Sequence, residues 1–176
     1  MYLISILIIR YAVNILDAAE ARLAKMHDMP GHLVRRFQQI AVAVFHTQVT
    51  EAGFDLTPVQ YAALATVEAN PGLDQITLAG LIAYDRTTIG GVVDRLVGKG
   101  FLTRRASEKD RRARVLEVTR EGRDTLRDVL PAVEAAQRMM LRGLSPDEAD
   151  IFLRLIRQAI DSTNDLSRAP LRPEQQ

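Results

Sequence analysis

The chain has 176 residues, of which 47% are hydrophobic and 26% are charged, and its formal net charge is +1. These values are typical of one soluble globular domain, or of two small subdomains that share a core, and they exclude a disordered or collagen-like chain. The sequence has no cysteine, which excludes a disulfide scaffold, a thiolate zinc site, a cysteine nucleophile and a thiol redox switch. The three histidines, His27, His32 and His46, lack HxxH or HExxH spacing, so we expect neither a metal nor a cofactor.

The near-zero net charge hides a basic segment. Residues 84–114 contain nine basic and four acidic residues, a net charge of +5, so the remaining 145 residues carry −4. A basic surface on an otherwise acidic body is typical of a protein that binds a polyanion, although a solvated charged surface has the same composition. The elements around these residues have to decide between the two interpretations.

The N-terminus begins with nine apolar residues, MYLISILII, which are too few to span a bilayer and are followed by Arg10. A secretory signal has its basic residues before the apolar run, so this pattern does not fit one. We therefore expect a cytoplasmic protein without membrane contact. Residues 1–30 are interpreted as an extension, which is either an extra helix over a dimer surface or upstream sequence from a misassigned start, with Met26 or Met29 as the true initiator.

Residues 31–56 are predicted to form a dimerisation helix. Helical spacing over residues 32–50 makes one side apolar through Leu33, Phe37, Ile40, Ala41 and Val44, and a second side through Val34, Phe45 and Val49. A helix with two apolar sides has to be covered on both of them, which suits a subunit interface.

Residues 57–119 are predicted to form a winged helix-turn-helix domain. Thr57-Pro58-Val59-Gln60 combines a capping threonine, a proline at the first helical position and a glutamine at the third, which is a helix start. Asn70-Pro71-Gly72 ends that helix. A short helix over residues 75–82 follows, for which we expect Ile76, Ala79 and Ile82 on one face.

The next helix is predicted to run from its N-cap, Asp85, to residue 99. Its buried stripe contains Ile89, Val92, Val93, Leu96 and Val97. Gly100 is the expected left-handed residue that ends it.

Two strand-like runs, residues 102–105 and 115–119, surround the polar loop 107–112 and predict a hairpin, the wing. Thr119 is expected to cap a helix that reaches about residue 142, and Ser145-Pro146-Asp147-Glu148 begins a last one. Residues 120–166 are the predicted second set of dimerisation helices, and residues 167–176 a mobile tail. The predicted fold is therefore mainly α with a small β-hairpin wing, a winged helix-turn-helix domain flanked by N- and C-terminal dimerisation helices.

A helix-turn-helix reads DNA with the N-terminal part of its second helix, which lies in the major groove. Here the outer face of that part carries the candidate DNA contacts Arg86, Thr87, Thr88 and, after two glycines, Arg95. Arginine can bind guanine through two hydrogen bonds, and threonine can donate, accept or contact a thymine methyl. The alternative role of the arginines is surface salt bridging, for which Asp94 lies beside Arg95.

The two glycines, Gly90 and Gly91, each cost roughly 1 kcal/mol relative to alanine in a helix interior. Without side chains they allow a close approach, either to phosphates or to a packed neighbour. The sequence leaves both alternatives open.

The tip of the wing carries a second group of candidate DNA contacts, Lys109, Asp110, Arg111 and Arg112. A rigid turn can push an arginine into the narrow and strongly negative minor groove, and an adjacent acid can hold that arginine extended. The alternative is an ordinary solvated turn.

Three segments carry a family resemblance: LTPVQYAALATV, TLAGLIAYDRTTIGGVVDRLVGKGFLTRR and EKDRRARVLEVTREG. About residues 31–162 resemble the MarR family of bacterial winged-helix regulators. The resemblance implies an obligate homodimer, built from the N- and C-terminal helices, that binds pseudo-palindromic double-stranded operators, usually as a repressor. It implies that Arg112 is the minor-groove arginine and Asp110 the acid that positions it. Residues 1–27 depart from the common pattern of the family.

The resemblance also implies a small-molecule effector, because members often bind anionic aromatic compounds or their CoA thioesters between the dimer helices and the winged domain. The candidate ligand contacts in this chain are Arg36, Tyr61, His32 and His46. Arg36 can hold a carboxylate, and Tyr61 can stack on an aromatic ring or hydrogen-bond to it. Surface charge for the arginine and core packing for the tyrosine are the alternatives.

Two other classes of function fit the sequence less well. A winged helix used only for protein–protein assembly, without an effector, would have a neutral or apolar wing, and the basic segment argues against it. An enzyme is not expected, since the sequence contains no recognisable catalytic acid pair, phosphate-binding glycine loop or nucleophile elbow.

Overall fold

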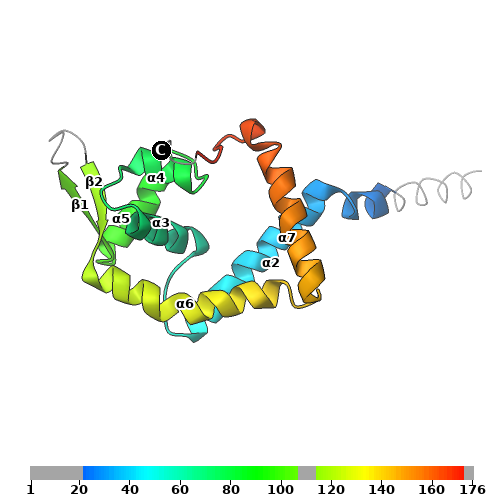
Figure 1. The fold of residues 1–176 in the computed structure, drawn as a ribbon, viewed down its shortest axis with the longest axis horizontal. Coiled ribbons are helices and arrows are strands. Elements are labelled where there is room, and N and C mark those ends of the chain that lie inside the picture. The colour runs from blue at the N-terminus through cyan, green and yellow to red at the C-terminus, as the bar shows by residue number, and fades with distance from the viewer. Residues whose placement is uncertain (1–21, 107–113, 173–176) are drawn as a thin grey trace, which may run out of the picture. The chain divides into compact units, whose positions relative to one another are not determined.

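The protein is described by a computed structural model that covers residues 22–106 and 114–172, and the chain consists of two units, residues 1–41 and 42–176. Residues 22–27 are helical. The elements that follow (Figure 1) are α2 (Pro30–Glu51), α3 (Pro58–Ala69), α4 (Gln75–Leu81), α5 (Ile89–Gly98), β1 (Leu102–Ala106), β2 (Arg114–Val118), α6 (Arg120–Met140), α7 (Pro146–Asp161) and the 3-10 helix η1 (Asn164–Leu166). The predicted fold, mainly helical with one β-hairpin, is confirmed.

Two helices begin with the capping boxes that the sequence predicts. At α3 the Thr57 hydroxyl accepts a hydrogen bond from the Gln60 N–H (3.3 Å), and the Gln60 side chain accepts one from the Thr57 N–H (3.1 Å). At α7 the Glu148 carboxylate accepts from the Ser145 N–H at 2.8 Å, and proline occupies the first turn of both helices. Each box satisfies backbone donors that a helix start leaves free, so these boundaries are set locally.

Gly100 ends α5 as predicted. Its φ of +76° lies in the left-handed region that glycine adopts without strain. The Phe101 N–H donates to the Leu96 carbonyl and the Gly100 N–H to the Val97 carbonyl, both at 2.9 Å, which is the Schellman pattern. The chain therefore turns directly from α5 into β1.

The core of residues 42–176 lies where the helix-turn-helix, the hairpin and α6 meet. The fully buried side chains there come from all of these elements and include Leu64, Val67, Leu78, Ile89, Val93, Leu96, Leu102, Leu116 and Val129. Each fully buried aliphatic side chain contributes about 1.5–3 kcal/mol of transfer free energy. The predicted stripe of α5 is confirmed, with Val97 partly rather than fully buried.

The predicted inner face of α4 is wrong in one respect. Ile76 is 61% exposed, whereas Leu78 and Ala79 are buried against α3, α5 and β2. The reason is the cap, because the Asp74 carboxylate accepts hydrogen bonds from the backbone N–H groups of Ile76 (2.7 Å) and Thr77 (2.9 Å). Ile76 therefore lies in the exposed first turn, and only the second turn of this short helix packs on the core.

Helices α2 and α7 each expose several large apolar side chains. No residue of α7 is buried, and its Ile151 and Leu155 are 49% and 51% exposed. On α2, Leu33, Val34 and Ile40 are also exposed, while Phe45 and Val49 near its end are buried. None of the helices within residues 22–106 and 114–172 combines the length and the apolar character needed to cross a membrane.

Candidate nucleic-acid interface

The turn before α5 is built around Asp85. Its carboxylate accepts hydrogen bonds from the Thr87 N–H (2.7 Å) and the Thr87 hydroxyl, and these bonds hold the pKa of Asp85 below its ordinary value. The Asp85 carbonyl accepts from the Ile89 N–H at 3.0 Å. Asp85 therefore caps this segment, but regular helix begins at Ile89 and not directly after Asp85, which corrects the predicted boundary. A short polar turn satisfies the same donors before the helix starts.

Arg86, Thr87 and Thr88 lie in this turn and are exposed. The Thr87 hydroxyl donates to the Asp85 carboxylate and the Thr88 hydroxyl to the Asp85 carbonyl (3.1 Å). Both threonine protons are thus used to hold the turn, which leaves lone pairs and methyl groups for any contact with a base. Among the described residues, Arg86 has no hydrogen-bonding partner for its guanidinium and no ion pair within 4.0 Å.

The outer face of α5 presents Arg95. The carboxylate beside it, Asp94, pairs with Arg104 of β1 at 2.6 Å. Arg95 has no ion pair within 4.0 Å in the described part of the chain, so salt bridging to Asp94 is not its role there. An exposed pair such as Asp94–Arg104 contributes about 0–1 kcal/mol, but it removes one acid from the surface on which Arg95 lies.

The hairpin is attached to the helix-turn-helix through its second strand. β1 and β2 pair antiparallel from Leu102 opposite Val118 to Ala106 opposite Arg114. The Leu116 N–H also donates to the Leu73 carbonyl (2.9 Å). The segment before α4 therefore pairs with β2 through a single antiparallel bridge, in which Asp74 lies opposite Val115. Residues 107–113 lie outside the described residues, and with them the predicted contacts Lys109, Asp110, Arg111 and Arg112.

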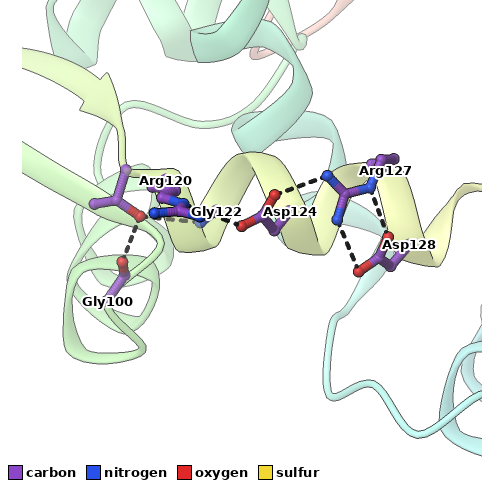
Figure 2. A network of polar contacts seen from close by, with 7 residues as sticks. Gly100, Arg120, Gly122, Asp124, Arg127 and Asp128 are labelled. Carbon is purple, nitrogen blue, oxygen red and sulfur yellow. Dashed lines mark hydrogen bonds and ion pairs between the residues drawn. The ribbon is translucent and has the colours of Figure 1, made fainter.

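A hydrogen-bonded junction connects the end of α5, the hairpin and α6 (Figure 2). The Thr119 hydroxyl donates to the Gly100 carbonyl (2.7 Å) and accepts from the Gly122 N–H (2.9 Å). Further along α6, Arg127 hydrogen-bonds to Asp124 and Asp128, each at 2.8 Å. These hydrogen bonds of Thr119 are partly buried and involve backbone atoms. They therefore hold the end of β2 and the start of α6 against the end of α5.

The four predicted ligand contacts fall in different units. His32 and Arg36 belong to residues 1–41, whereas His46 and Tyr61 belong to residues 42–176. Tyr61 is partly buried against the core, with its ring 6.2 Å from that of Phe45. His46 and Arg36 are exposed. The structure does not bring these four residues together within one unit, and their role in ligand binding stays a prediction.

His32 has an unusual environment within its own unit. Its ring stacks on that of His27 at 5.1 Å, and its Nε2 is buried without a hydrogen-bonding partner. Desolvation lowers the pKa of His32, and the neighbouring charges of Arg35, His27 and Arg36 lower it further. The neutral form of the ring is therefore favoured.

Comparison with known proteins decides the family. The MarR family model matches residues 56–113, which contain the capped helix α3, the turn at Asp85, α5 and β1. A putative transcriptional regulatory protein for the hcr operon of Thauera aromatica is 32% identical over 142 residues, which are 81% of this chain and 85% of that protein. The chain belongs to the MarR family.

Solved structures extend this relationship beyond the matched segment. The PcaV transcriptional regulator of Streptomyces coelicolor, in complex with its natural ligand, is 36% identical and has a TM-score of 0.71, with 78% of this chain and 96% of PcaV covered. BpsR of Bordetella bronchiseptica, whose DNA binding is regulated by 6-hydroxynicotinic acid, is 27% identical with a TM-score of 0.71 and coverages of 77% and 95%. These MarR-type relatives are transcriptional regulators, a role that is not enzymatic.

The structure of this MarR-family protein distinguishes Gly90 from Gly91 in α5. A Cβ atom on Gly90 would lie 3.4 Å from the Gln75 side chain, whereas a Cβ on Gly91 would meet no described atom within 4 Å. Gly91 is also exposed. Packing against a neighbour within the described chain therefore does not require a glycine at position 91, which favours close approach to a phosphate.

We expect Gly91→Ala to stabilise the protein and to weaken its DNA binding. Alanine in a helix interior is more favourable than glycine by about 1 kcal/mol, and the new methyl group has space. The matched control is Gly98→Ala in the same helix, where a Cβ also meets nothing within 4 Å. Thermal unfolding should show a higher Tm for both variants. A DNA titration should show a several-fold loss of affinity for Gly91→Ala alone. Equal DNA affinity of the two variants would contradict the close approach.

Sequence reasoning missed two groups of residues at this interface. Arg104 of β1 approaches Asp94 (2.6 Å), and its guanidinium also lies 3.5 Å from the side-chain oxygen of Gln75 in α4. Residues 168–172 lie beside the Asp85 turn, where Arg168 and Arg172 line a cavity together with Arg86. The signal in the sequence was the presence of Arg168 and Arg172 in the tail. Composition alone does not show that these arginines lie beside the Asp85 turn.

Proposed function

We propose that this MarR-family regulator is a homodimeric, sequence-specific DNA-binding repressor. In this proposal it leaves a pseudo-palindromic operator when it binds a small anionic aromatic compound or its CoA thioester. The observation that carries the proposal is the exposure of Arg86 and Arg95 at the turn and outer face of α5, while Asp94 is neutralised by Arg104. A helix that presents unpaired arginines beside a wing suits insertion in a major groove about 12 Å wide.

The exposed apolar side chains of α2 and α7 support the homodimer. Ile151 and Leu155 of α7, and Leu33 and Val34 of α2, form large apolar surface on helices near the two ends of the chain. Helices that each expose several large apolar side chains mark an interface more often than a solvated face. Two copies related by a twofold axis would present two recognition helices to two half-sites about one DNA turn apart.

The effector class is supported by BpsR, whose ligand, 6-hydroxynicotinic acid, is an aromatic carboxylic acid. We propose Arg36, Tyr61, His32 and His46 as contacts with such a ligand. An arginine can pair with the carboxylate, and the neutral imidazole of His32, whose Nε2 lacks a partner, can accept a hydrogen bond from a phenolic hydroxyl.

The test is a fluorescence-anisotropy titration of the purified protein against DNA from the region flanking its own gene. We expect tight binding whose affinity falls steeply as salt is raised, because each neutralised phosphate releases a counterion. Sedimentation in the same buffer should give a dimer. Absence of salt-dependent binding to any duplex would contradict the proposal and would favour a protein–protein assembly module.

A ligand panel tests the regulation. The titration is repeated with benzoate-like, phenolic and pyridine carboxylic acids, and we expect one of them to release the DNA. If a compound lowers the affinity for DNA by a given factor, the DNA must lower the affinity for that compound by the same factor, which calorimetry can measure. Tight DNA binding that no compound in the panel changes would contradict the ligand class and would leave the DNA-binding function unaffected.

A further inference from the structure

The segment that follows α7 is anchored on the helix-turn-helix. After η1, the Asn164 side chain donates to the Leu171 carbonyl (3.1 Å) and accepts from the Leu171 N–H (2.8 Å), which closes a loop. The Arg172 N–H then donates to the Gly80 carbonyl of α4 at 2.9 Å. In Figure 1 the red segment, the last part of the described chain, runs close to α4. We call residues 164–172 the C-terminal strap.

Gly80 allows this close approach. A Cβ atom at Gly80 would lie 3.3 Å from the Cβ of Arg172, which is tighter than most contacts of a Cβ atom. Ala169 and Pro170 of the strap are half-buried, although they lie at the end of the chain. The strap is therefore held by both backbone hydrogen bonds and packing. The backbone that carries Arg168 and Arg172 has a defined position as a result.

A cavity of about 330 Å³ lies between the strap and the turn that precedes α5. Its polar lining includes three arginines, Arg86 from the turn and Arg168 and Arg172 from the strap, together with Asp85 and Thr87. The Asp85 carboxylate already accepts two hydrogen bonds from Thr87. The three guanidinium groups have no hydrogen bond and no ion pair within 4.0 Å to another described residue. The cavity is thus a positive site with unused donors.

The position of this site indicates which anion it binds. Arg86 and Thr87 are candidate DNA contacts, and they form one wall of the cavity. Arginine forms paired, charge-assisted hydrogen bonds with phosphate oxygens. A duplex that receives α5 in its major groove brings backbone phosphates to both rims of the groove, and contacts to them fix the register of the protein without reading sequence.

We propose that the C-terminal strap is a DNA-binding element, and that Arg168 and Arg172, with Arg86, bind a backbone phosphate of the operator beside the recognition helix. This inference rests on the proposed DNA-binding function and adds a fixed phosphate contact to the turn, α5 and the wing. The ordering of the strap is already achieved in the free protein, so the arginines lose less conformational entropy on binding than a flexible basic tail would.

The test compares the variant Arg168→Ala/Arg172→Ala with wild-type protein in DNA titrations over a series of salt concentrations. We expect about tenfold weaker binding both to the operator and to an unrelated duplex, since phosphates are common to both. The salt slope should become shallower by about 1 for each phosphate contact that is lost. The variant Arg168→Lys/Arg172→Lys keeps both charges, so the salt dependence of its DNA affinity should be close to that of wild-type protein.

Two controls separate the site from general effects. Arg138→Ala/Arg142→Ala removes the same charge near the end of α6, where Arg138 forms one exposed ion pair with Glu134 (3.8 Å), so apart from that weak pair it measures the loss of long-range attraction. Asn164→Ala removes the clamp of the strap and keeps both arginines, and we expect an intermediate loss of affinity with the same direction of slope change. Thermal unfolding of the arginine variants should match that of wild-type protein.

The outcomes are distinguishable. A salt slope of the strap variant equal to that of the Arg138/Arg142 control would overturn the inference and leave the proposed function intact. A loss confined to the operator would also overturn it, because a phosphate contact does not depend on sequence. Binding of inorganic phosphate by the wild-type protein that is lost in the strap variant, while that variant keeps the DNA affinity and salt slope of wild-type protein, would assign the site to a free anion and overturn the DNA contact. A wild-type protein that binds no DNA would overturn both proposals.

Discussion

Replacing Gly122 with alanine is expected to destabilise the protein by about 3 kcal/mol, because a side chain at this position has no space. A Cβ atom there would lie 2.3 Å from the Phe101 carbonyl oxygen and 2.8 Å from a methyl carbon of Val118. The carbonyl cannot move away freely, since it accepts a hydrogen bond from the Thr119 N–H at 3.0 Å. The substitution therefore forces the hairpin apart from the first turn of α6.

Thermal and denaturant unfolding measure this effect. For a chain of this length, 3 kcal/mol corresponds to a decrease in Tm of roughly 6–12 °C. Gly143→Ala is the control, because a Cβ on Gly143 meets no described atom within 4 Å and its φ is not positive. We expect Gly143→Ala to leave Tm nearly unchanged. Equal stabilities of the two variants would show that the junction of Thr119, Gly100 and Gly122 is not held as the structure has it.

Replacing Arg112 with alanine is expected to weaken operator binding about 10- to 100-fold in each half-site, while the fold and the dimer persist. A minor-groove arginine at the wing tip gains from the negative potential of a narrow groove, and the loss of one arginine contact costs about 1–3 kcal/mol. Arg112 lies outside the described residues, in the segment between the paired strands, which end at Ala106 and begin at Arg114.

Competition titrations with operators of different A·T content measure the specificity of this contact. We expect Arg112→Ala to lose affinity most where the minor groove at the wing is narrow. Arg142→Ala, a substitution that also removes one positive charge, serves as the control and should change affinity only slightly. If Arg112→Ala binds the operator as the control does, the assignment of the wing as a minor-groove reader is wrong.

Much of the fold was predictable because its signals are local. The capping boxes at Thr57 and Ser145 and the left-handed residue Gly100 satisfy backbone groups within a few positions along the chain. The paired strands also follow from short alternating runs on either side of a polar loop. At the interface, the exposure of Arg86 and Arg95 agrees with their placement on the outer face before and within α5.

The sequence by itself therefore determined the order of the elements, the family resemblance and the basic character of the segment around α5, because each of these depends on nearby residues. Only the tertiary structure decided the pairing of Asp94 with Arg104, the exposure of Ile76 and the anchoring of the strap at Gly80. These features join residues far apart in the chain. Their free energies depend on which surfaces the packed core leaves next to one another, and no periodicity or composition specifies that.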